Sequence, residues 1–168
     1  ETFDPQTKEE FIYCGPFRMQ DSLVNSSLLI GEALLSPTRT YLPVVKSIMS
    51  ERGESILGLV HCSGGGQTKC MRFGTNVYHI KDNLFTPPPL FQEIQRVSGT
   101  TDNEMHQVYN MGHRFEVYCK PEAVDDIIAL SNIYQIDAKV IGHTEKSMKA
   151  DHHNHLSIKT DNFELNYG

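Results

Sequence analysis

The chain has 168 residues, 39% of them hydrophobic and 21% charged, and it carries a formal net charge of −6. This composition indicates a globular domain with a sizeable core and excludes a disordered chain. The negative charge argues against nucleic acid or an anionic membrane as a partner, and every apolar run is far shorter than a membrane span. Four scattered cysteines without metal-site spacing indicate reduced thiols in a cytoplasmic protein, with no metal bound.

The first half of the chain predicts one helix and two strands. Residues 1–27 show little periodicity, so we expect a lead-in or interdomain segment there. Apolar residues at helical spacing predict a helix over 42–52, and Gly53 suits a stop directly after it. The apolar run that begins at Ile56 predicts a short buried strand ending at His61, and 77–80 form a second strand candidate.

The second half predicts two consecutive helices and then a β-α-β unit over residues 113–142. The helices begin at the proline run 87–89 and at the capping-box pair Thr101 and Glu104. The unit comprises a strand over 115–119, a helix opened by Pro121 and a returning strand over Asp137–Gly142.

These elements indicate an α+β domain, in which helices pack on a mixed β-sheet. We expect this domain over residues 28–145, between the lead-in of residues 1–27 and a polar C-terminal extension, 146–168. The extension holds one strand candidate around Leu156–Ile158. Its histidines at 152–155 lack a clearly spaced acidic or cysteine partner, which favours a solvated tail over a metal site.

The most informative motif directly follows the strand that ends at His61. Ser63 and three consecutive glycines, 64–66, form a loop, and Gln67 could begin a short helix. Because glycine has no Cβ, the N–H groups of such a loop can converge on an anion, while His61 and Ser63 could add side-chain hydrogen bonds. A plain tight turn is the alternative interpretation of the loop taken alone.

Two further motifs stand in a fixed order around this loop. Pro37-Thr38-Arg39-Thr40-Tyr41 lies upstream, and Asn110-Met111-Gly112 lies downstream after Pro88-Pro89-Leu90-Phe91. Taken in this order and spacing, the motifs resemble the C-terminal domain of the aminoimidazole ribonucleotide (AIR) synthase family, also called phosphoribosylformylglycinamidine cyclo-ligases. The resemblance runs from about Ile30 to Glu145 and implies the α+β architecture of that domain.

The resemblance implies a role for each motif. A guanidinium at Arg39 could clamp a phosphate, although without the resemblance a surface pair with Glu32 or Glu51 would be favoured. An imidazole at His61 could act as a general acid or base, or could simply be a satisfied histidine at a strand end. The predicted catalytic residue is therefore His61, and the predicted substrate-binding residues are Thr38, Arg39, Ser63, Gly64, Gly65, Gly66, Asn110 and Gly112.

The chain departs from the family pattern at two places. The family usually continues after the three glycines with a segment like Glu-Asn-Ile-Pro-Arg, whereas this chain has Gln67-Thr68-Lys69-Cys70-Met71-Arg72. Arg114 stands where the family tends to have a small residue. The new cations could add phosphate contacts, or they could mark a divergent relative with an altered substrate.

The resemblance also implies the activity of a complete enzyme in purine biosynthesis. ATP would activate the amide oxygen of a phosphorylated ribonucleotide, formylglycinamidine ribonucleotide, and ring closure would give aminoimidazole ribonucleotide. ATP and Mg²⁺ would be held mainly by an N-terminal domain, through which the family also forms homodimers. We expect this chain to lack that domain, to bind no cofactor by itself, to be inactive alone and to form the substrate-side wall of the cleft.

Two other function classes stay open at this point. The first is another ATP-using member of the superfamily: formylglycinamidine ribonucleotide synthetase, a hydrogenase-maturation protein, selenophosphate synthetase or thiamine-phosphate kinase. The second is a stand-alone binding module without catalysis. An upstream domain with an aspartate-rich metal-binding loop would separate the two classes.

Overall fold

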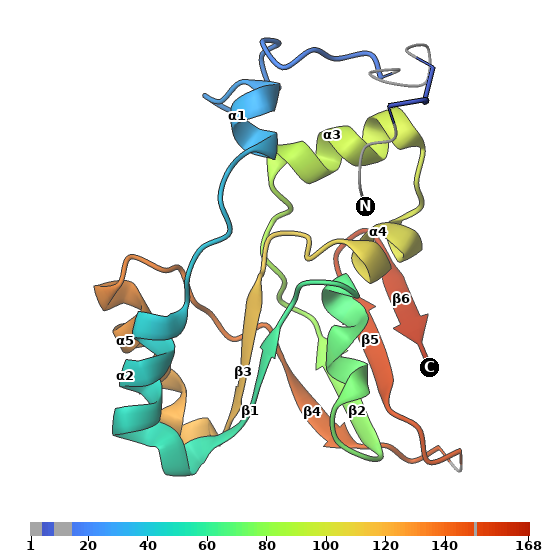
Figure 1. Ribbon diagram of the computed structural model, residues 1–168. Coiled ribbons are helices and arrows are strands. Elements are labelled where there is room, and N and C mark those ends of the chain that lie inside the picture. Colours follow the sequence, from blue (N-terminus) through green and yellow to red (C-terminus); the bar gives the residue numbers. More distant parts are fainter. Residues whose placement is uncertain (1–4, 9–14, 150) are drawn as a thin grey trace. The chain divides into compact units, whose positions relative to one another are not determined.

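The computed structural model describes residues 5–8, 15–149 and 151–168 (Figure 1). The chain divides into two compact units, each described here by itself. The first comprises Glu1–Thr38 and Pro88–Thr100, and the second comprises Arg39–Pro87 and Thr101–Gly168. Within the described ranges, no helix is long and apolar enough to cross a membrane.

Among its described residues, the first unit contains two helices, α1 (Ile30–Leu34) and α3 (Pro89–Ser98). The proline run begins α3 as predicted, because a proline at the first helical position lacks only an N–H that would have no helical partner. Gly99 closes α3 in the left-handed conformation, with φ +67°. The N–H of Gly31 donates to Met19 O at 2.9 Å, which ties α1 to the segment before it.

A two-stranded antiparallel sheet lies at the centre of the second unit. It pairs β1 (Ile56–His61) with β3 (Phe115–Cys119), so that His61 lies opposite Phe115. The helices α2 (Leu42–Arg52) and α5 (Val124–Ile133) pack together on one face of this pair (Figure 1). Their shared core consists of Val44, Ile48, Ala123, Ile127 and Leu130, against which Val117 and Cys119 of β3 pack.

A four-stranded mixed sheet forms the other half of the second unit. Its order is β4 (Gly142–Lys146), β2 (Val77–Lys81), β5 (His155–Lys159) and β6 (Glu164–Tyr167), with β2 and β5 parallel and the other pairs antiparallel. Two short helices, η3 (Gly66–Arg72) and α4 (Asp102–Val108), precede β2 and β3 respectively. Cys70 of η3 forms a second core cluster with Leu156 and Ile158 of β5.

Most of the predicted elements are confirmed, including α2, β1, β3 and the Thr101 cap, whose hydroxyl accepts from the Glu104 N–H. Gly53 follows α2 but does not stop it through a left-handed turn, because its φ is −52° and a 3₁₀ turn, η2 (Gly53–Ser55), continues the chain. The short strand candidate near Leu156–Ile158 is confirmed as part of β5.

The returning strand was predicted at the wrong place. A strand, a helix and a strand do follow one another, but the last is β4, which begins at Gly142 and pairs with β2 rather than β3. The carbonyl of Ile141 accepts from the N–H groups of Asp82 and Asn83, and the Asn83 amide donates to Val140 O at 2.7 Å. Residues 140 and 141 are thus bound by the turn that leaves β2, and strand pairing starts only after them.

The C-terminal histidine run is not simply a solvated tail. The side chain of His155 is only 2% exposed and bonds Asp151 Oδ1 at 3.1 Å. It is buried because β5 lies between β2 and β6 in the mixed sheet. Cys62, Cys70 and Cys119 are free thiols, whereas Cys14 lies outside the described residues.

Candidate functional site

The end of β1 carries His61 into a small aromatic cluster. The Tyr41 ring stacks on Phe115, with centroids 5.1 Å apart, and meets the His61 ring edge-on at 6.1 Å. His61 itself is exposed, because outward-facing residues alternate along β1. An exposed imidazole at a strand end is accessible to a ligand, and its catalytic role stays a prediction.

Arg39 lies beside the same cluster. Its Nη1 donates to Gln135 O at 3.0 Å, and the side chain is exposed. Burial raises the pKa of Tyr41, while the charges of Arg114 and Arg39 act to lower it, so both guanidinium groups lie near this phenol. Thr38 is exposed and ends the first unit.

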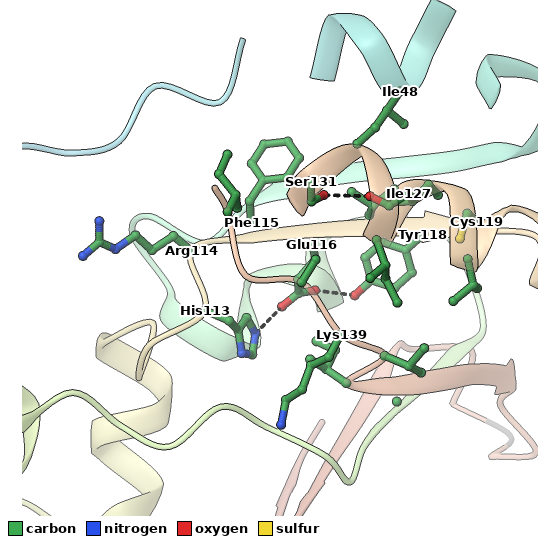
Figure 2. Close-up of a pocket in the computed structure, with 18 of the residues that line it drawn as sticks. Ile48, His113, Arg114, Phe115, Glu116, Tyr118, Cys119, Ile127, Ser131 and Lys139 are labelled. Atoms are coloured by element: carbon green, nitrogen blue, oxygen red, sulfur yellow. Dashed lines mark hydrogen bonds and ion pairs between the residues drawn. The ribbon is translucent and has the colours of Figure 1, made fainter. Parts of the chain in front are cut away.

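A pocket of about 910 Å³ opens along β3 (Figure 2). Of the predicted site residues in the second unit, Arg39 and Gly112 line it. Ile48 and Ile127 supply apolar wall, while Arg114 is exposed and points away from the buried Glu116 carboxylate (Figure 2). The pocket therefore combines an apolar interior with two arginines, a combination suited to an anionic ligand with an apolar or planar body.

The glycine loop is a closed turn in which the three glycines differ. The N–H of Gly66 donates to Ser63 O at 3.1 Å, and that of Thr68 donates to Gly65 O at 2.9 Å. A Cβ on Gly66 would collide with Tyr109 O and lie 2.8 Å from His106 O, whereas a Cβ on Gly64 would meet nothing within 4 Å. The tight-turn interpretation thus explains why a glycine is needed at position 66. Packing gives no such reason at Gly64, where there is open space beside the loop.

Two cations flank this loop. Lys69 Nζ donates to Ser63 Oγ at 2.7 Å. Arg72 Nη2 lies 3.7 Å from the position that a Cβ on Gly65 would occupy. Both cations belong to the segment that departs from the family pattern, and they offer positive charge beside Ser63 and the open side of Gly64.

The Asn110-Met111-Gly112 motif forms a left-handed turn. Met111 has φ +50° and Gly112 φ +109°. The Asn110 side chain stabilises this turn itself, because its Oδ1 accepts from the Gly112 N–H at 3.1 Å. A main-chain bond from Cys62 N to Arg114 O, 2.8 Å long, ties the residues just after this turn to the end of β1.

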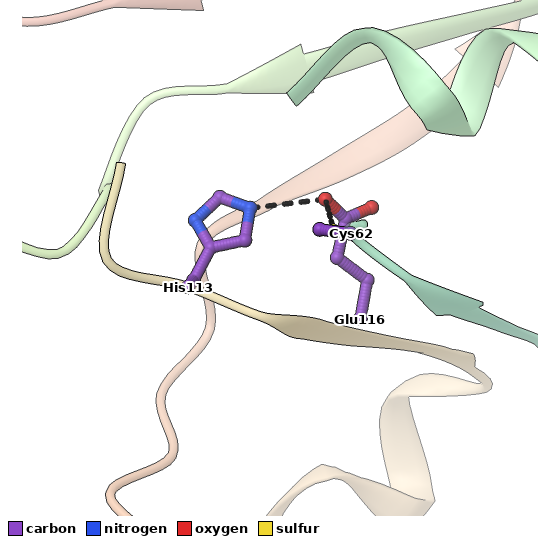
Figure 3. A group of neighbouring side chains, drawn as sticks. All are labelled: Cys62, His113 and Glu116. Carbon is purple, nitrogen blue, oxygen red and sulfur yellow. Dashed lines mark hydrogen bonds and ion pairs between the residues drawn. The ribbon is translucent and has the colours of Figure 1, made fainter. Parts of the chain in front are cut away.

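A buried ionic network is centred on Glu116, and Figure 3 shows two of its members, His113 and Cys62, beside the carboxylate. Lys81 Nζ lies 2.6 Å from Glu116 Oε1, with both side chains under 5% exposed. His113 Nε2 and Cys62 Sγ reach the same oxygen at 3.0 and 3.2 Å, and the Tyr118 hydroxyl donates to Oε2 at 2.6 Å. Four donors therefore share this carboxylate, three of them on Oε1 and one on Oε2.

The protonation states follow from this arrangement. Burial acts to raise the pKa of Glu116, but the bonds from His113, Lys81 and Tyr118 and the Lys81 charge together hold it below its ordinary value. Burial lowers the pKa of His113, although Glu116 offsets this in part. Burial and the Glu116 charge raise the pKa of the Cys62 thiol, so Cys62 is protonated and not a reactive thiolate.

Cys62, His113 and Glu116 offer sulfur, nitrogen and oxygen atoms within 4.8 Å of one another, a donor set that Zn²⁺ accepts. In this structure the donors of Cys62, His113 and Lys81 instead converge on one oxygen of Glu116. A metal ion would have to displace the Lys81 ammonium that already balances the carboxylate. The set is thus a hydrogen-bonded carboxylate rather than a cation cage.

Sequence reasoning did not single out Lys81, Glu116 or His113. A signal was available: Lys81 ends an apolar strand pattern, and Glu116 stands between Phe115 and Val117 within another. A charge inside an apolar strand is buried only when it is paired, so two such charges point to each other.

Residues 17–153 match the family described as AIR synthase related protein, C-terminal domain, and the chain belongs to this family. It is similar to the phosphoribosylformylglycinamidine cyclo-ligase of Methanocaldococcus jannaschii, at 36% identity over 122 residues, which cover 73% of this chain and 35% of that protein. The enzyme of the same name from Methanococcus vannielii is 37% identical over 139 residues, 80% of this chain and 39% of the relative. The predicted family and α+β fold class are confirmed, and the chain spans little more than a third of these relatives' length.

Proposed function

We propose that this chain forms the substrate-side part of a cyclo-ligase-like enzyme that acts on a phosphorylated ribonucleotide. The observation that carries the proposal is the clustering of motifs far apart in sequence at one end of the β1–β3 pair. Tyr41 contacts both His61 and Phe115, and the amide of Gln67 donates to Asn110 O. Membership in the family and the names of the relatives support the same reaction class.

In this proposal the glycine loop holds the phosphate of the ribonucleotide. Ser63 Oγ and the open side of Gly64 face the ligand, and Lys69 and Arg72 supply the opposite charge. Arg39, Asn110 and Gly112 contact the rest of the substrate. ATP and Mg²⁺ are held mainly by another domain of the complete enzyme, which pairs with this chain and with a second copy of itself.

His61 is the proposed acid–base group. When ATP has converted the amide oxygen of the substrate into a phosphorylated leaving group, the attacking nitrogen loses a proton as the ring closes and phosphate departs. The exposed imidazole of His61 can accept such a proton when its ring is neutral. The contact with the Tyr41 ring orients the His61 ring for that role.

Binding of inorganic phosphate and of ribose-5-phosphate tests the loop. Backbone amide NMR shifts should move over Ser63–Thr68 at millimolar ligand, and Lys69→Met should weaken the response several-fold by removing one charge contact. Lys46→Met is the matched control, since Lys46 is an exposed lysine on α2. Shifts confined to other regions, or none, would overturn the anion loop and leave the plain turn.

We also propose that the chain alone does not hydrolyse ATP or form aminoimidazole ribonucleotide. Its purified form should show no turnover, whereas addition of a separately expressed ATP-binding domain from a relative should restore it. Turnover by the purified chain that His61→Ala abolishes would refute this statement.

A further inference from the structure

A buried side chain, Gln67, connects the glycine loop with the Asn110–Gly112 turn. Gln67 is fully buried at the start of η3, directly after the glycines. Its Nε2 donates to Asn110 O and also contacts His113 Nδ1 at 3.2 Å. Its Oε1 accepts from Lys81 Nζ at 3.2 Å. Both N–H groups of this amide are therefore occupied by the segment between α4 and β3, and its oxygen is occupied by Lys81 of β2.

Lys81 fixes the main chain at the same point. Its Nζ donates to the backbone oxygen of Gln67 at 2.8 Å, to Gln67 Oε1 and to Glu116 Oε1 at 2.6 Å. An ammonium has three donors, and these three acceptors use all of them. The ion pair with Glu116 thus anchors the nitrogen that holds both the backbone and the side chain of Gln67.

The direction of each hydrogen bond in the chain is determined. His113 Nε2 donates to the Glu116 carboxylate, so the neutral ring has an unprotonated Nδ1. That nitrogen can accept only from a donor, which places the NH₂ group of Gln67 toward His113 and Asn110 and its oxygen toward Lys81. If the Gln67 amide were flipped, its NH₂ group would face the Lys81 ammonium, which is also a donor. Its oxygen would face Asn110 O, which is also an acceptor.

We propose that Gln67 is a positioning residue, through which the buried Lys81–Glu116 pair sets the spacing between the glycine loop and the Asn110–Gly112 turn. The expected effect on ligand binding rests on the proposed function, because the glycine loop and the Asn110–Gly112 turn are the proposed binding elements. It explains why glutamine follows the three glycines here. A side chain without an amide at this position would leave Lys81 with two acceptors instead of three, the backbone oxygen of residue 67 and Glu116 Oε1.

Two variants test the positioning role. Gln67→Met keeps the length and removes the amide. Gln67→Glu keeps an acceptor oxygen for Lys81 but replaces the NH₂ group that faces Asn110 O and His113 Nδ1 with a second carboxylate oxygen. Tyr118→Phe is the matched control, because the Tyr118 hydroxyl donates to Glu116 Oε2 and not to the carboxylate oxygen that accepts from Lys81.

Three readouts are expected to separate the variants. In the ligand-free chain, Gln67→Met should shift the Asn110–Gly112 amides together with the loop amides, and Tyr118→Phe should leave both sets in place. Loss of the positioning bonds should weaken the binding of inorganic phosphate about fivefold. In Gln67→Glu, ¹⁵N NMR of His113 should show protonation of Nδ1 at higher pH than in the wild type, a signature that packing alone would not produce.

The groups that face His113 are Glu116, Lys81 and His106, and none of them changes in Gln67→Glu. If His113 titrates identically in both proteins and the Asn110–Gly112 amides do not respond to Gln67→Met, the positioning role is refuted. If the wild type binds no phosphate but these ligand-free signals change as expected, the proposed function fails and the positioning role stands. If Gln67→Met does not fold, the Gln67→Glu titration decides the matter.

Discussion

Stability should fall sharply in mild acid because of one histidine, His79. Its side chain is 4% exposed on β2, packs edge-on against Tyr118 with centroids 5.6 Å apart, and has no hydrogen-bond partner at either ring nitrogen among the described residues. Burial and the Lys81 charge lower the pKa of His79 from 6.5 to about 4. The unfolded chain therefore takes up this proton first as the pH falls.

The sign and size of the change in unfolding free energy follow from the linkage between protonation and folding. Because the folded pKa is the lower one, the full stability is present above pH 6.5 and is lost progressively down to about pH 4. Between neutral pH and pH 5 the loss from this group alone is about 2 kcal/mol, and it approaches ~3 kcal/mol at still lower pH.

Urea unfolding of wild type and His79→Phe from pH 7.5 to pH 4.5 measures this loss. The phenylalanine keeps the contact with Tyr118 but cannot titrate. Other buried groups, such as His106 and His113, also have lowered pKa values and contribute equally to both curves. The stability of the wild type relative to His79→Phe should therefore fall by about 2 kcal/mol between neutral pH and pH 5, and curves that stay parallel would refute the assignment to His79.

Two further pairs of substitutions and one single substitution test the fold by chemical denaturation. Gly66→Ala should cost at least about 2 kcal/mol because its Cβ meets backbone oxygens at φ +48°, whereas Gly64→Ala, in open space, should stay within about 0.5 kcal/mol; equal effects would contradict the packing explanation. Ile158→Ala, at a fully buried position, should cost about 2–5 kcal/mol, and Leu57→Ala, 69% exposed, much less. Thr101→Ala should cost about 1 kcal/mol through loss of the cap on α4, and an unchanged midpoint would argue against that cap.

The elements that local pattern determines were predictable. The spacing of Val45 and Ile48 in α2 and the apolar run of β1 specify these elements because their signals lie within one segment. The hydroxyl of Thr101 likewise caps the helix that directly follows it. Each of these interactions joins residues only a few positions apart, which is the range over which a sequence pattern carries information.

The elements that depend on distant partners were not predictable in the same way. The start of β4 is set by the carbonyl of Ile141, whose donors come from the turn after β2. The burial of His155 depends on β5 pairing with both β2 and β6. A polar, histidine-rich segment indicates solvent unless the strands on each side of it are known.

The residues of the candidate site divide in the same way, into those that a local pattern predicts and those that depend on distant partners. The exposed residues His61, Ser63 and Gly64 lie within four consecutive positions of the motif that first indicated a ligand loop. Lys81 and Glu116 lie 35 positions apart, and either alone would be costly in the interior, because a buried charge without a partner is strongly destabilising. Such a pair is visible in sequence only as two unexplained charges within apolar strands.

The departure of this chain from its family pattern at Gln67 follows from that pair. With Glu116 on β3 and Lys81 on β2, the ammonium still needs two acceptors from the segment after the glycines, and a glutamine supplies one from its side chain and one from its backbone. The side-chain amide of Gln67 then donates to Asn110 O, so the same residue also holds the Asn110–Gly112 turn. The altered residue is fully buried, whereas His61 and Gly64, which match the family pattern, are exposed. The divergence at Gln67 therefore changes how the loop is supported and leaves the proposed ligand-facing groups of the loop in place.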